Sequence, residues 1–346
     1  MVRTPIIDAE GGGDMATAAV TGGSGFIGSH LIESLTGRGD HVRALVRPTS
    51  RTEILEAAGA ELVPGDLQDT ESLAALVEGA DLVFHCGAIV SDWALPGAFD
   101  AVNATGARNV VNAVCEAGGR LLHVSSTDVY GFPDLGGLDE TTPRVRRGWG
   151  YVDAKIAGEE AVEAAVERGA LDAVIVRPAS VYGPRCPYFV EGCVQLMNDG
   201  QLSYINEGRA TGGFIYVSDL VRLILVAADS AENGSVFNGT GGHAETWREY
   251  FEGLAGVTGA TPITASLDKL EAFDMAAAYE AMSLADPRRG DPPLTRHAWA
   301  MYATDQNFSV SKAKSVLNWE PNTSLQLGLK QVGDWWAHTR GGNGDE

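Results

Sequence analysis

The feature that most constrains the fold is an alternation of short apolar runs with segments of helical periodicity in the first half of the chain. The apolar runs lie at 16–21, 41–47, within 60–66, and at 81–88, 120–126 and 171–178. The helical segments lie at 26–39, near 70–77, at 103–118 and from Tyr151 onward. Strands of near-continuous Val, Ile, Leu and Ala are typical of a parallel sheet covered by helices on both faces. With right-handed crossovers, the pattern predicts an α/β fold built on a doubly wound parallel Rossmann sheet.

The second half of the chain alternates less regularly and predicts a smaller mixed lobe. Amphipathic helices are expected in "TWREYFEGLAGVTG" and "SLQLGLKQVGDWWAHT", and a strand edge, a helix and a short strand at 214–240 return to the sheet. We therefore expect a dinucleotide-binding domain at 15–178 with 214–240, and a C-terminal substrate-binding lobe at 179–213 and 241–339. Residues 1–14 are expected to be a disordered leader and 340–346 a disordered tail.

Charge and cysteine usage exclude several classes of function. The 346 residues carry a formal net charge of −21, which opposes binding to nucleic acid or to an anionic membrane surface. No apolar run approaches the ~20 residues that span a bilayer, and no secretory signal is recognisable. The four cysteines form no C-x-x-C pair and show no zinc-like spacing, so we expect no metal and read them as reduced thiols of a cytoplasmic protein.

A glycine-rich loop follows the first expected strand and leads into a helix. The stretch "VTGGSGFIG" places glycines so that a tight turn lets the backbone approach a pyrophosphate at a helix N-terminus. A turn without a ligand is the alternative. The loop predicts cofactor binding by Gly22, Gly25, Phe26, Ile27 and Gly28.

The residues after the second and third strands bear on the choice of dinucleotide. Arg47 and Arg51 lie where an acidic residue would favour NAD, and a guanidinium suits a 2′-phosphate, so NADP(H) is favoured and NAD(H) stays open. Both could equally be solvated surface arginines. Asp66 ends the third strand and is followed by Leu67, and both are expected near the cofactor. The Asp66 carboxylate either accepts a hydrogen bond from the adenine amine or shapes a turn.

The stretch "GWGYVDAKIAGEE" places Tyr151 and Lys155 four residues apart at an expected helix start. Positions i and i+4 lie on one helix face, and an ammonium beside a phenol lowers the pKa of that phenol. The alternative is a solvated ion pair between Lys155 and Glu159.

Nine short motifs, in order, resemble the extended short-chain dehydrogenase/reductase family over about 15–339. They are "TGGSGFIG", "GDLQD", "VFHCGA", "NATGARNV", "HVSSTDVYG", "YVDAK", "RPASVYGP", "FIYVSDLV" and "LNWEPNTSL". The resemblance implies that Tyr151 is the catalytic acid/base and that Lys155 binds the nicotinamide ribose and lowers the tyrosine pKa. It implies that Ser126 hydrogen-bonds the reacting oxygen, which suits a strand end where two hydroxyls could meet a developing oxyanion. It also makes a homodimer through the Tyr151 helix plausible.

The same resemblance implies further cofactor contacts, each with a simple packing alternative. Backbone after the fourth strand passes the cofactor, Asn103 supports that region, and the loop after the sixth strand packs near the nicotinamide carboxamide. The residues concerned are Cys86, Gly87, Ala88, Asn103, Ser125, Pro178, Ser180 and Val181.

Two departures weaken a nucleotide-sugar substrate. Ser180 stands where such enzymes commonly carry an Asn, and Gly212 and Gly213 replace an Arg-Asp pair, although Arg209 lies close. The segment at 292–321 is similar to the 3β-hydroxysteroid dehydrogenase and dihydroflavonol-reductase-like branch, which implies apolar alcohols or ketones. Aromatic residues expected either to line an apolar pocket or to fill the core are Trp93, Tyr188, Phe189, Trp299 and Tyr302.

The sequence thus predicts an NADP(H)-dependent oxidoreductase that interconverts a secondary alcohol and a ketone on a sterol-like or flavonoid-like small molecule. A nucleotide-sugar 4-epimerase or dehydratase with tightly bound NAD is the first alternative. A non-catalytic cofactor-binding sensor is the second.

Overall fold

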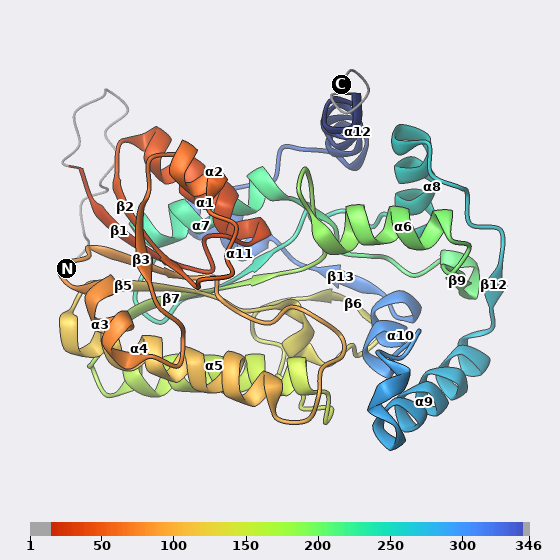
Figure 1. Ribbon diagram of the computed structural model, residues 1–346, viewed down its shortest axis with the longest axis horizontal. Coiled ribbons are helices and arrows are strands. Elements are labelled where there is room, and N and C mark those ends of the chain that lie inside the picture. Colours follow the sequence, from red (N-terminus) through yellow and green to blue (C-terminus); the bar gives the residue numbers. More distant parts are fainter. Residues whose placement is uncertain (1–14, 342–346) are drawn as a thin grey trace.

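The computed structural model describes residues 15–341, and a seven-stranded parallel sheet forms its centre (Figure 1). The strand order is β11-β7-β5-β4-β1-β2-β3, with every neighbouring pair parallel. The strands are β1 (Thr17–Thr21), β2 (His41–Val46), β3 (Glu61–Pro64), β4 (Leu82–His85), β5 (Arg120–Val124), β7 (Asp172–Pro178) and β11 (Val236–Gly239). The chain direction across the sheet reverses between β1 and β4, so the carboxyl ends of these strands open a crevice where such sheets bind ligands. The predicted fold class is confirmed.

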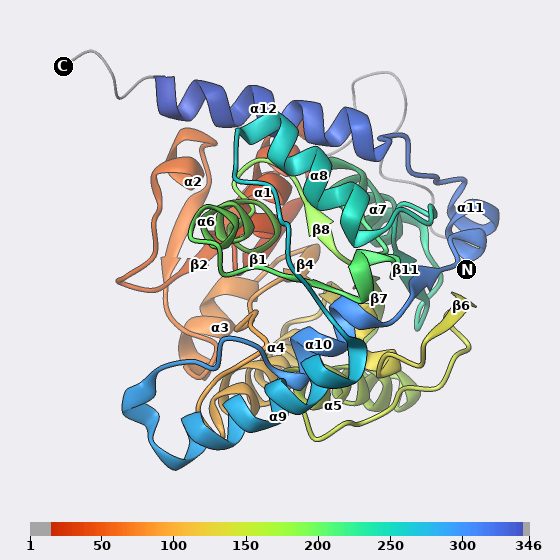
Figure 2. The same cartoon turned by 90° about the vertical axis from the view of Figure 1, so that its right-hand side faces the viewer.

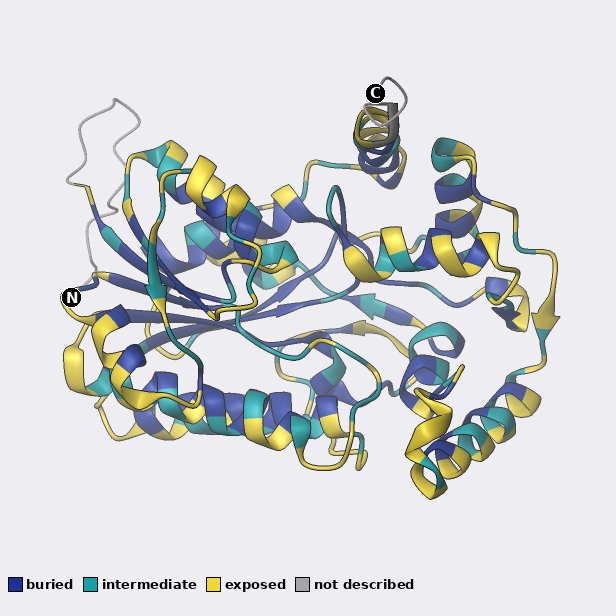
Figure 3. Ribbon diagram, in the orientation of Figure 1, coloured by how far each residue is buried: buried dark blue, intermediate teal, exposed yellow. Residues whose placement is uncertain are grey.

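Helices cover both faces of this sheet, as its apolar strands require (Figure 1). One face carries α1 (Phe26–Arg38), α2 (Glu53–Ala57), α7 (Val217–Ser230) and α11 (Ser311–Leu317). The other carries α3 (Thr70–Val77), α4 (Gly106–Ala117) and α5 (Gly150–Glu167). Two separate buried clusters result, and the inner strands β4 and β5 between them are entirely buried, whereas no residue of the edge strand β3 is buried (Figure 3).

The remaining elements form a second body beside the carboxyl edge of the sheet (Figure 2). Its helices are α6 (Cys193–Asn198), α8 (Trp247–Thr258), α9 (Lys269–Ala285), α10 (Arg296–Ala303) and α12 (Leu325–Gly341). Its short parallel ladders pair β8 (Val181–Tyr182) with β10 (Ile215–Tyr216), β9 (Tyr204–Ile205) with β12 (Ser266–Leu267), and β6 (Leu135–Leu138) with β13 (Gln306–Phe308). The helices predicted from "TWREYFEGLAGVTG" and "SLQLGLKQVGDWWAHT" are confirmed as α8 and α12. An aromatic core that includes Tyr182, Phe214, Trp247 and Tyr250 holds α6, α8 and α12 together.

Within residues 15–341, five α-helices were not predicted, namely α2, α6, α9, α10 and α11, and the structure shows the physical reason for two of them. α2 has five residues and buries Leu55, too little for a periodic pattern. α9 buries Ala272, Ala276, Glu280 and Ser283, a stripe of small and polar residues that hydrophobic periodicity cannot reveal.

The predicted leader at 1–14 lies outside the described residues. Of the predicted tail, α12 includes the first two positions, and 342–346 lie outside. The predicted domain boundaries stay predictions. Within residues 15–341, no helix is long and apolar enough to cross a membrane.

Candidate active site

The glycine loop brings the start of α1 against the loop that follows β4. Gly22 has a φ of +72°, and a Cβ there would lie 2.6 Å from the backbone nitrogen of Gly87. Gly25 donates its N–H to the Gly22 carbonyl at 3.0 Å, and a Cβ on Gly28 would clash with that carbonyl. No side chain caps α1, so the first-turn N–H groups at Phe26 and Ile27 stay available to an anion. The loop therefore fits a dinucleotide pyrophosphate.

An open cavity of about 510 Å³ lies at the ends of β2 and β3. Its lining consists of Arg47, Pro48, Thr49, Pro64, Gly65, Asp66 and Asp69. The Arg47 guanidinium is exposed and has no hydrogen-bond or ion-pair partner within residues 15–341. Arg51 is also exposed, but it does not line the cavity. The cavity can take an adenosine, with Arg47 as the cation beside it.

Asp66 and Leu67 have structural contacts of their own. The Asp66 carboxylate accepts from the backbone N–H of Gln68 at 3.0 Å, which is the turn-forming alternative, and it still faces the cavity. Leu67 is buried and packs against Gly87 and Gly106. Leu67 therefore belongs to the buried core and does not line the cavity.

The loop after β4 is held in place by Asn103. Its side-chain oxygen accepts from the Ile89 N–H at 2.7 Å, and its amide donates to the Ile89 carbonyl at 2.9 Å. Gly87 donates to the Thr21 hydroxyl at 3.2 Å, and Cys86 and Ala88 are half-buried beside it. Asn103 supports this backbone, as the resemblance implied.

Ser126, Tyr151 and Lys155 come together at the carboxyl edge of the sheet. Ser126 follows β5 and accepts the Asp128 N–H at 3.1 Å, which starts the turn at Thr127–Tyr130. Tyr151 stands in the first turn of α5, and its hydroxyl lies close enough to the Ser126 side chain for Ser126 to lower the Tyr151 pKa. The Lys155 Nζ lies 5.9 Å from the centre of the Tyr151 ring, one helical turn further along α5. All three side chains are less than 10% exposed.

Burial dominates the acid–base properties of these groups. Burial, followed by the nearby Asp128 carboxylate, raises the pKa of Tyr151 above its usual value, and the hydrogen bond from Ser126 opposes this. Burial also lowers the pKa of Lys155 to about 8, and its Nζ donates to the Val124 carbonyl at 2.9 Å. Lys155 is not among the groups that set the pKa of Tyr151 in this arrangement, and the expectation that it lowers this pKa stays a prediction.

The alternative ion pair between Lys155 and Glu159 is not formed. The Glu159 carboxylate receives two hydrogen bonds from Arg177, at 2.8 and 2.7 Å, and one from Arg144 at 2.9 Å. Ser125 lies beside Glu159 and helps to hold the pKa of this carboxyl low, which places Ser125 in the buried ionic network behind the site.

The loop after β7 serves packing in the structure. Pro178 ends the strand, the Ser180 carbonyl accepts from Ile215 at 3.0 Å, and Val181 belongs to the core beneath α7. A contact of Pro178, Ser180 and Val181 with a carboxamide stays a prediction.

Two residues that the sequence analysis did not single out, Asp128 and His297, adjoin Tyr151. The His297 Nε2 lies 3.0 Å from the Asp128 carboxylate, and the imidazole stacks on the Tyr151 ring with centres 5.8 Å apart. Asp128 could have been noticed, because it follows Ser126 by two positions. His297 is 169 positions beyond Asp128, and no local pattern links them.

The aromatic residues expected near the substrate divide between two roles. Tyr302 and Phe189 pack on Trp247, and Trp299 packs on Phe273, so these three fill the core of the second body. Tyr188 is 48% exposed and close enough to influence the pKa of Tyr151. Trp93 is half-buried in the loop after β4.

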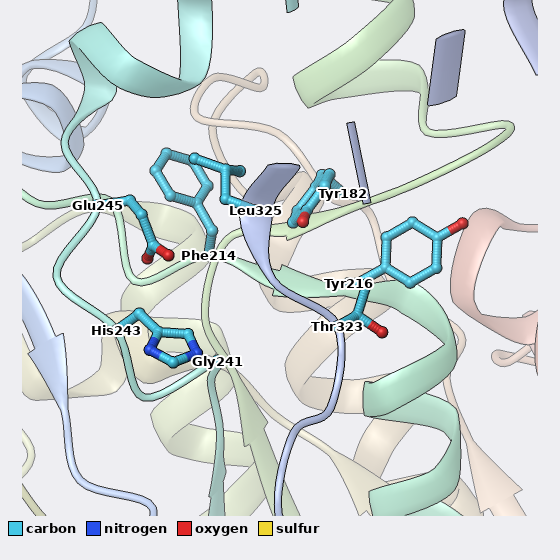
Figure 4. A pocket seen from close by; sticks show the side chains of 8 residues that line it. All are labelled: Tyr182, Phe214, Tyr216, Gly241, His243, Glu245, Thr323 and Leu325. Atoms are coloured by element: carbon cyan, nitrogen blue, oxygen red, sulfur yellow. The ribbon is translucent and has the colours of Figure 1, made fainter. Parts of the chain in front are cut away.

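A second, much smaller pocket has about 10 Å³ of space, enough for about one water molecule. Figure 4 shows the His243 imidazole and the Glu245 carboxylate on one side of it and the rings of Tyr182 and Tyr216 on the other. We assign no ligand to it.

Comparisons with known proteins agree with this geometry. The model of the "NAD dependent epimerase/dehydratase family" matches residues 18–238. The chain is 28% identical to a 2-alkyl-3-oxoalkanoate reductase of Stenotrophomonas maltophilia, over 90% of this chain and 97% of the relative. It is also 28% identical to 3beta-hydroxysteroid-dehydrogenase/decarboxylase isoform 1 of Arabidopsis thaliana, over 94% of this chain and 80% of the relative.

Among solved structures, the fold is similar to MoeE5 in complex with UDP-glucose and NAD. The TM-score is 0.73 at 25% identity, and the match covers 94% of this chain and 99% of MoeE5. The family match spans the glycine loop, the Ser126–Tyr151–Lys155 group and the last strand of the sheet. The chain belongs to the NAD dependent epimerase/dehydratase family and is an NAD(P)-dependent enzyme of the extended short-chain dehydrogenase/reductase type.

Proposed function

We propose that the protein is an NADP(H)-dependent oxidoreductase that interconverts a ketone and a secondary alcohol on a fairly apolar small molecule. The observation that carries this proposal is that the buried side chains of Ser126 and Tyr151 lie side by side, with Lys155 one helical turn beyond. The bound nicotinamide would supply or accept the hydride.

The two hydroxyls can stabilise the charge that develops on the substrate oxygen. As a carbonyl is reduced, negative charge gathers on its oxygen, and donors from Ser126 and Tyr151 would meet it there. Burial keeps the pKa of Tyr151 high, so its phenol holds a proton ready to give to that oxygen. The Lys155 ammonium, buried below the ring, would offset the charge left on Tyr151.

The preference for NADP(H) rests on Arg47. Its guanidinium lines the cavity at the end of β2 and is free of protein partners within residues 15–341, so it can bind a 2′-phosphate. Binding of NAD(H) stays open, since the family is described by NAD and MoeE5 was solved with NAD.

An apolar ketone is favoured over a nucleotide sugar. Arg209, which lies close to the place where nucleotide-sugar enzymes carry an Arg-Asp pair, is 68% exposed and pairs with Glu207 at 2.5 Å. The loop after β4 exposes Val90 and Leu95, which suits an apolar entrance. The names of the two relatives describe a 3-oxo acid and a 3β-hydroxysteroid as substrates of those proteins.

The test is to follow the absorbance of reduced nicotinamide with NADPH and NADH over a panel of apolar ketones. We expect turnover of at least one ketone, faster with NADPH. Turnover of a UDP- or dTDP-sugar but of no ketone, with NAD retained through purification, would favour the epimerase or dehydratase alternative instead. A homodimer and a cytoplasmic location stay predictions of the sequence.

A further inference from the structure

The His297 imidazole has a buried nitrogen that no protein group uses. The side chain is 6% exposed, its Nε2 pairs with Asp128, and its Nδ1 has no hydrogen-bond partner within the described chain. A buried polar atom without a partner destabilises a protein, so such an atom calls for an explanation.

The imidazole is held rigidly against the proposed catalytic residues. Its ring lies nearly parallel to Tyr151, at 21° with centres 5.8 Å apart, and nearly parallel to Trp149, at 20° and 5.7 Å. Asp128, which fixes Nε2, belongs to the turn that Ser126 begins. These contacts tie the position of the imidazole to both the tyrosine and the turn of the serine.

The geometry also limits what the free nitrogen can bind. When Nε2–H donates to Asp128, an acceptor such as a carboxylate can use the second nitrogen only if that nitrogen also carries a proton, so that both ring nitrogens act as donors. Because the imidazole stacks on the Tyr151 ring with centres 5.8 Å apart, an acceptor held at Nδ1 would lie on the same side of the site as Tyr151.

Resting on the proposed function, we propose that His297 is a substrate-binding residue that receives the carboxylate of a 3-oxo acid. In such a molecule the carboxylate is separated from the reacting carbonyl by one carbon, so both oxygens can face the Tyr151–His297 stack at once. The apolar chain of the acid would extend toward the loop after β4, whose Asp92 accepts a hydrogen bond from Thr295 at 2.7 Å, two positions before His297.

The experiment compares kcat and KM for a 3-oxo acid and for the ketone of equal chain length that lacks the carboxylate. We expect the unaltered enzyme to prefer the acid. His297→Gln places an amide where Nε2 was and leaves nothing at Nδ1. In this variant kcat/KM for the acid should fall by on the order of ten- to a hundredfold, mostly through a higher KM. For the ketone, kcat/KM should change less than about threefold.

Two further variants separate binding from structure. His297→Asn places its amide nearer the Nδ1 position and should keep part of the preference for the acid. His243→Gln alters an exposed histidine elsewhere and should leave kcat/KM unchanged for both substrates. As a measurement that needs no variant, the matching 3-hydroxy acid should inhibit ketone reduction by the unaltered enzyme at least tenfold more strongly than the matching alcohol.

Several outcomes would overturn the inference. Equal losses for acid and ketone in His297→Gln would show a structural role. An unaltered enzyme that reduces the ketone as well as the acid would reject the carboxylate site and leave the proposed function standing. Failure to turn over either compound, or any other ketone, would reject the proposed function itself.

Discussion

At the scale of one side chain, Tyr151 keeps its proton because burial and the neighbouring Asp128 carboxylate raise its pKa. Tyr151→Phe removes the hydroxyl and keeps the ring that packs on Phe99 and His297. We expect kcat to fall by a factor on the order of 10² or more, the usual effect of losing a positioned acid. Cofactor binding, measured by fluorescence of the reduced nicotinamide, should be unchanged. Turnover near that of the unaltered enzyme would refute the acid role.

Lys155 gives the reaction a pH dependence. Burial lowers the pKa of its ammonium from the usual 10.5 to about 8, so the positive charge near Tyr151 is present below about pH 8 and lost above it. We expect the rate of ketone reduction to fall as the pH rises through about 8. Across about 8 to 10.5 the unfolded chain holds more protons at this group, so its effect on folding stability becomes more favourable with rising pH. A kcat profile that stays flat through pH 9, with the fold intact, would contradict the assignment.

Arg47 and Arg51 offer a matched pair of variants for the choice of cofactor. Arg47 lines the adenosine cavity and Arg51 does not. We expect Arg47→Asp to shift the ratio of kcat/KM for NADPH over NADH by on the order of tenfold or more toward NADH, through loss of a charge-assisted bond and repulsion of the phosphate. Arg51→Asp should leave the ratio within about twofold. An unchanged ratio in Arg47→Asp would remove the basis for preferring NADP(H).

At the scale of elements, the glycine loop fixes where α1 begins. Gly22→Ala puts a methyl group 2.6 Å from the Gly87 nitrogen at a φ of +72°, so the loop must shift away from the loop after β4. We expect cofactor affinity to drop at least tenfold, with a lower melting temperature. Gly37→Ala, also in this region but inside α1 with open space around it, should leave cofactor affinity unchanged and add about 0.5–1 kcal/mol of stability. Titration of both variants with NADPH makes the comparison, and equal affinities would show that the close contact is dispensable.

Elements with a strong apolar pattern could be predicted, and those without one could not. The six strands expected up to residue 178, the glycine loop and the helices α1, α4, α5, α8 and α12 follow from local sequence, because burial on one or both faces imposes a period. Helix α9 was not predicted, because small and polar residues rather than large apolar ones line its buried side. The meeting of Ser126 with Tyr151 could be anticipated from strand ends and motif order. The stacking of His297 on Tyr151 could not, because it depends on how α10 packs far along the chain.

At the scale of the whole molecule, a buried ionic network joins α5 to three parts of the sheet layer. Glu159 binds Arg177 of β7, Arg177 donates to the Tyr130 hydroxyl at 3.0 Å, and that hydroxyl donates to Asn238 of β11 at 2.7 Å. Burial would raise the pKa of Glu159, but Arg177 holds it below its usual value. The carboxylate therefore contributes stability at neutral pH that is lost as the pH falls through its folded pKa.

Removing this carboxylate should be costly. Glu159→Ala leaves the Arg177 guanidinium, 3% exposed, without its ionic partner, and we expect a loss of about 3–5 kcal/mol in the free energy of unfolding. Glu160→Ala breaks a pair with Arg146 in which both side chains are about half exposed, and it should cost no more than about 1 kcal/mol. Denaturant unfolding of the two variants measures the difference, and similar losses would mean that the network adds nothing beyond a surface pair.

The strand order also bears on how the chain matures on the ribosome. The strands β1 to β5 and β7 lie side by side in this sheet, whereas β6 pairs with β13 elsewhere. The seventh strand of the sheet, β11, joins at the outer edge next to β7. A nascent polypeptide that has emerged through Pro178 thus holds every strand of a contiguous six-stranded sheet, together with Glu159 and Arg177. Translation of the next sixty or so residues then adds β11, whose Asn238 accepts a hydrogen bond from the Tyr130 hydroxyl. The sheet can therefore be completed at its outer edge without breaking strand pairs that formed earlier.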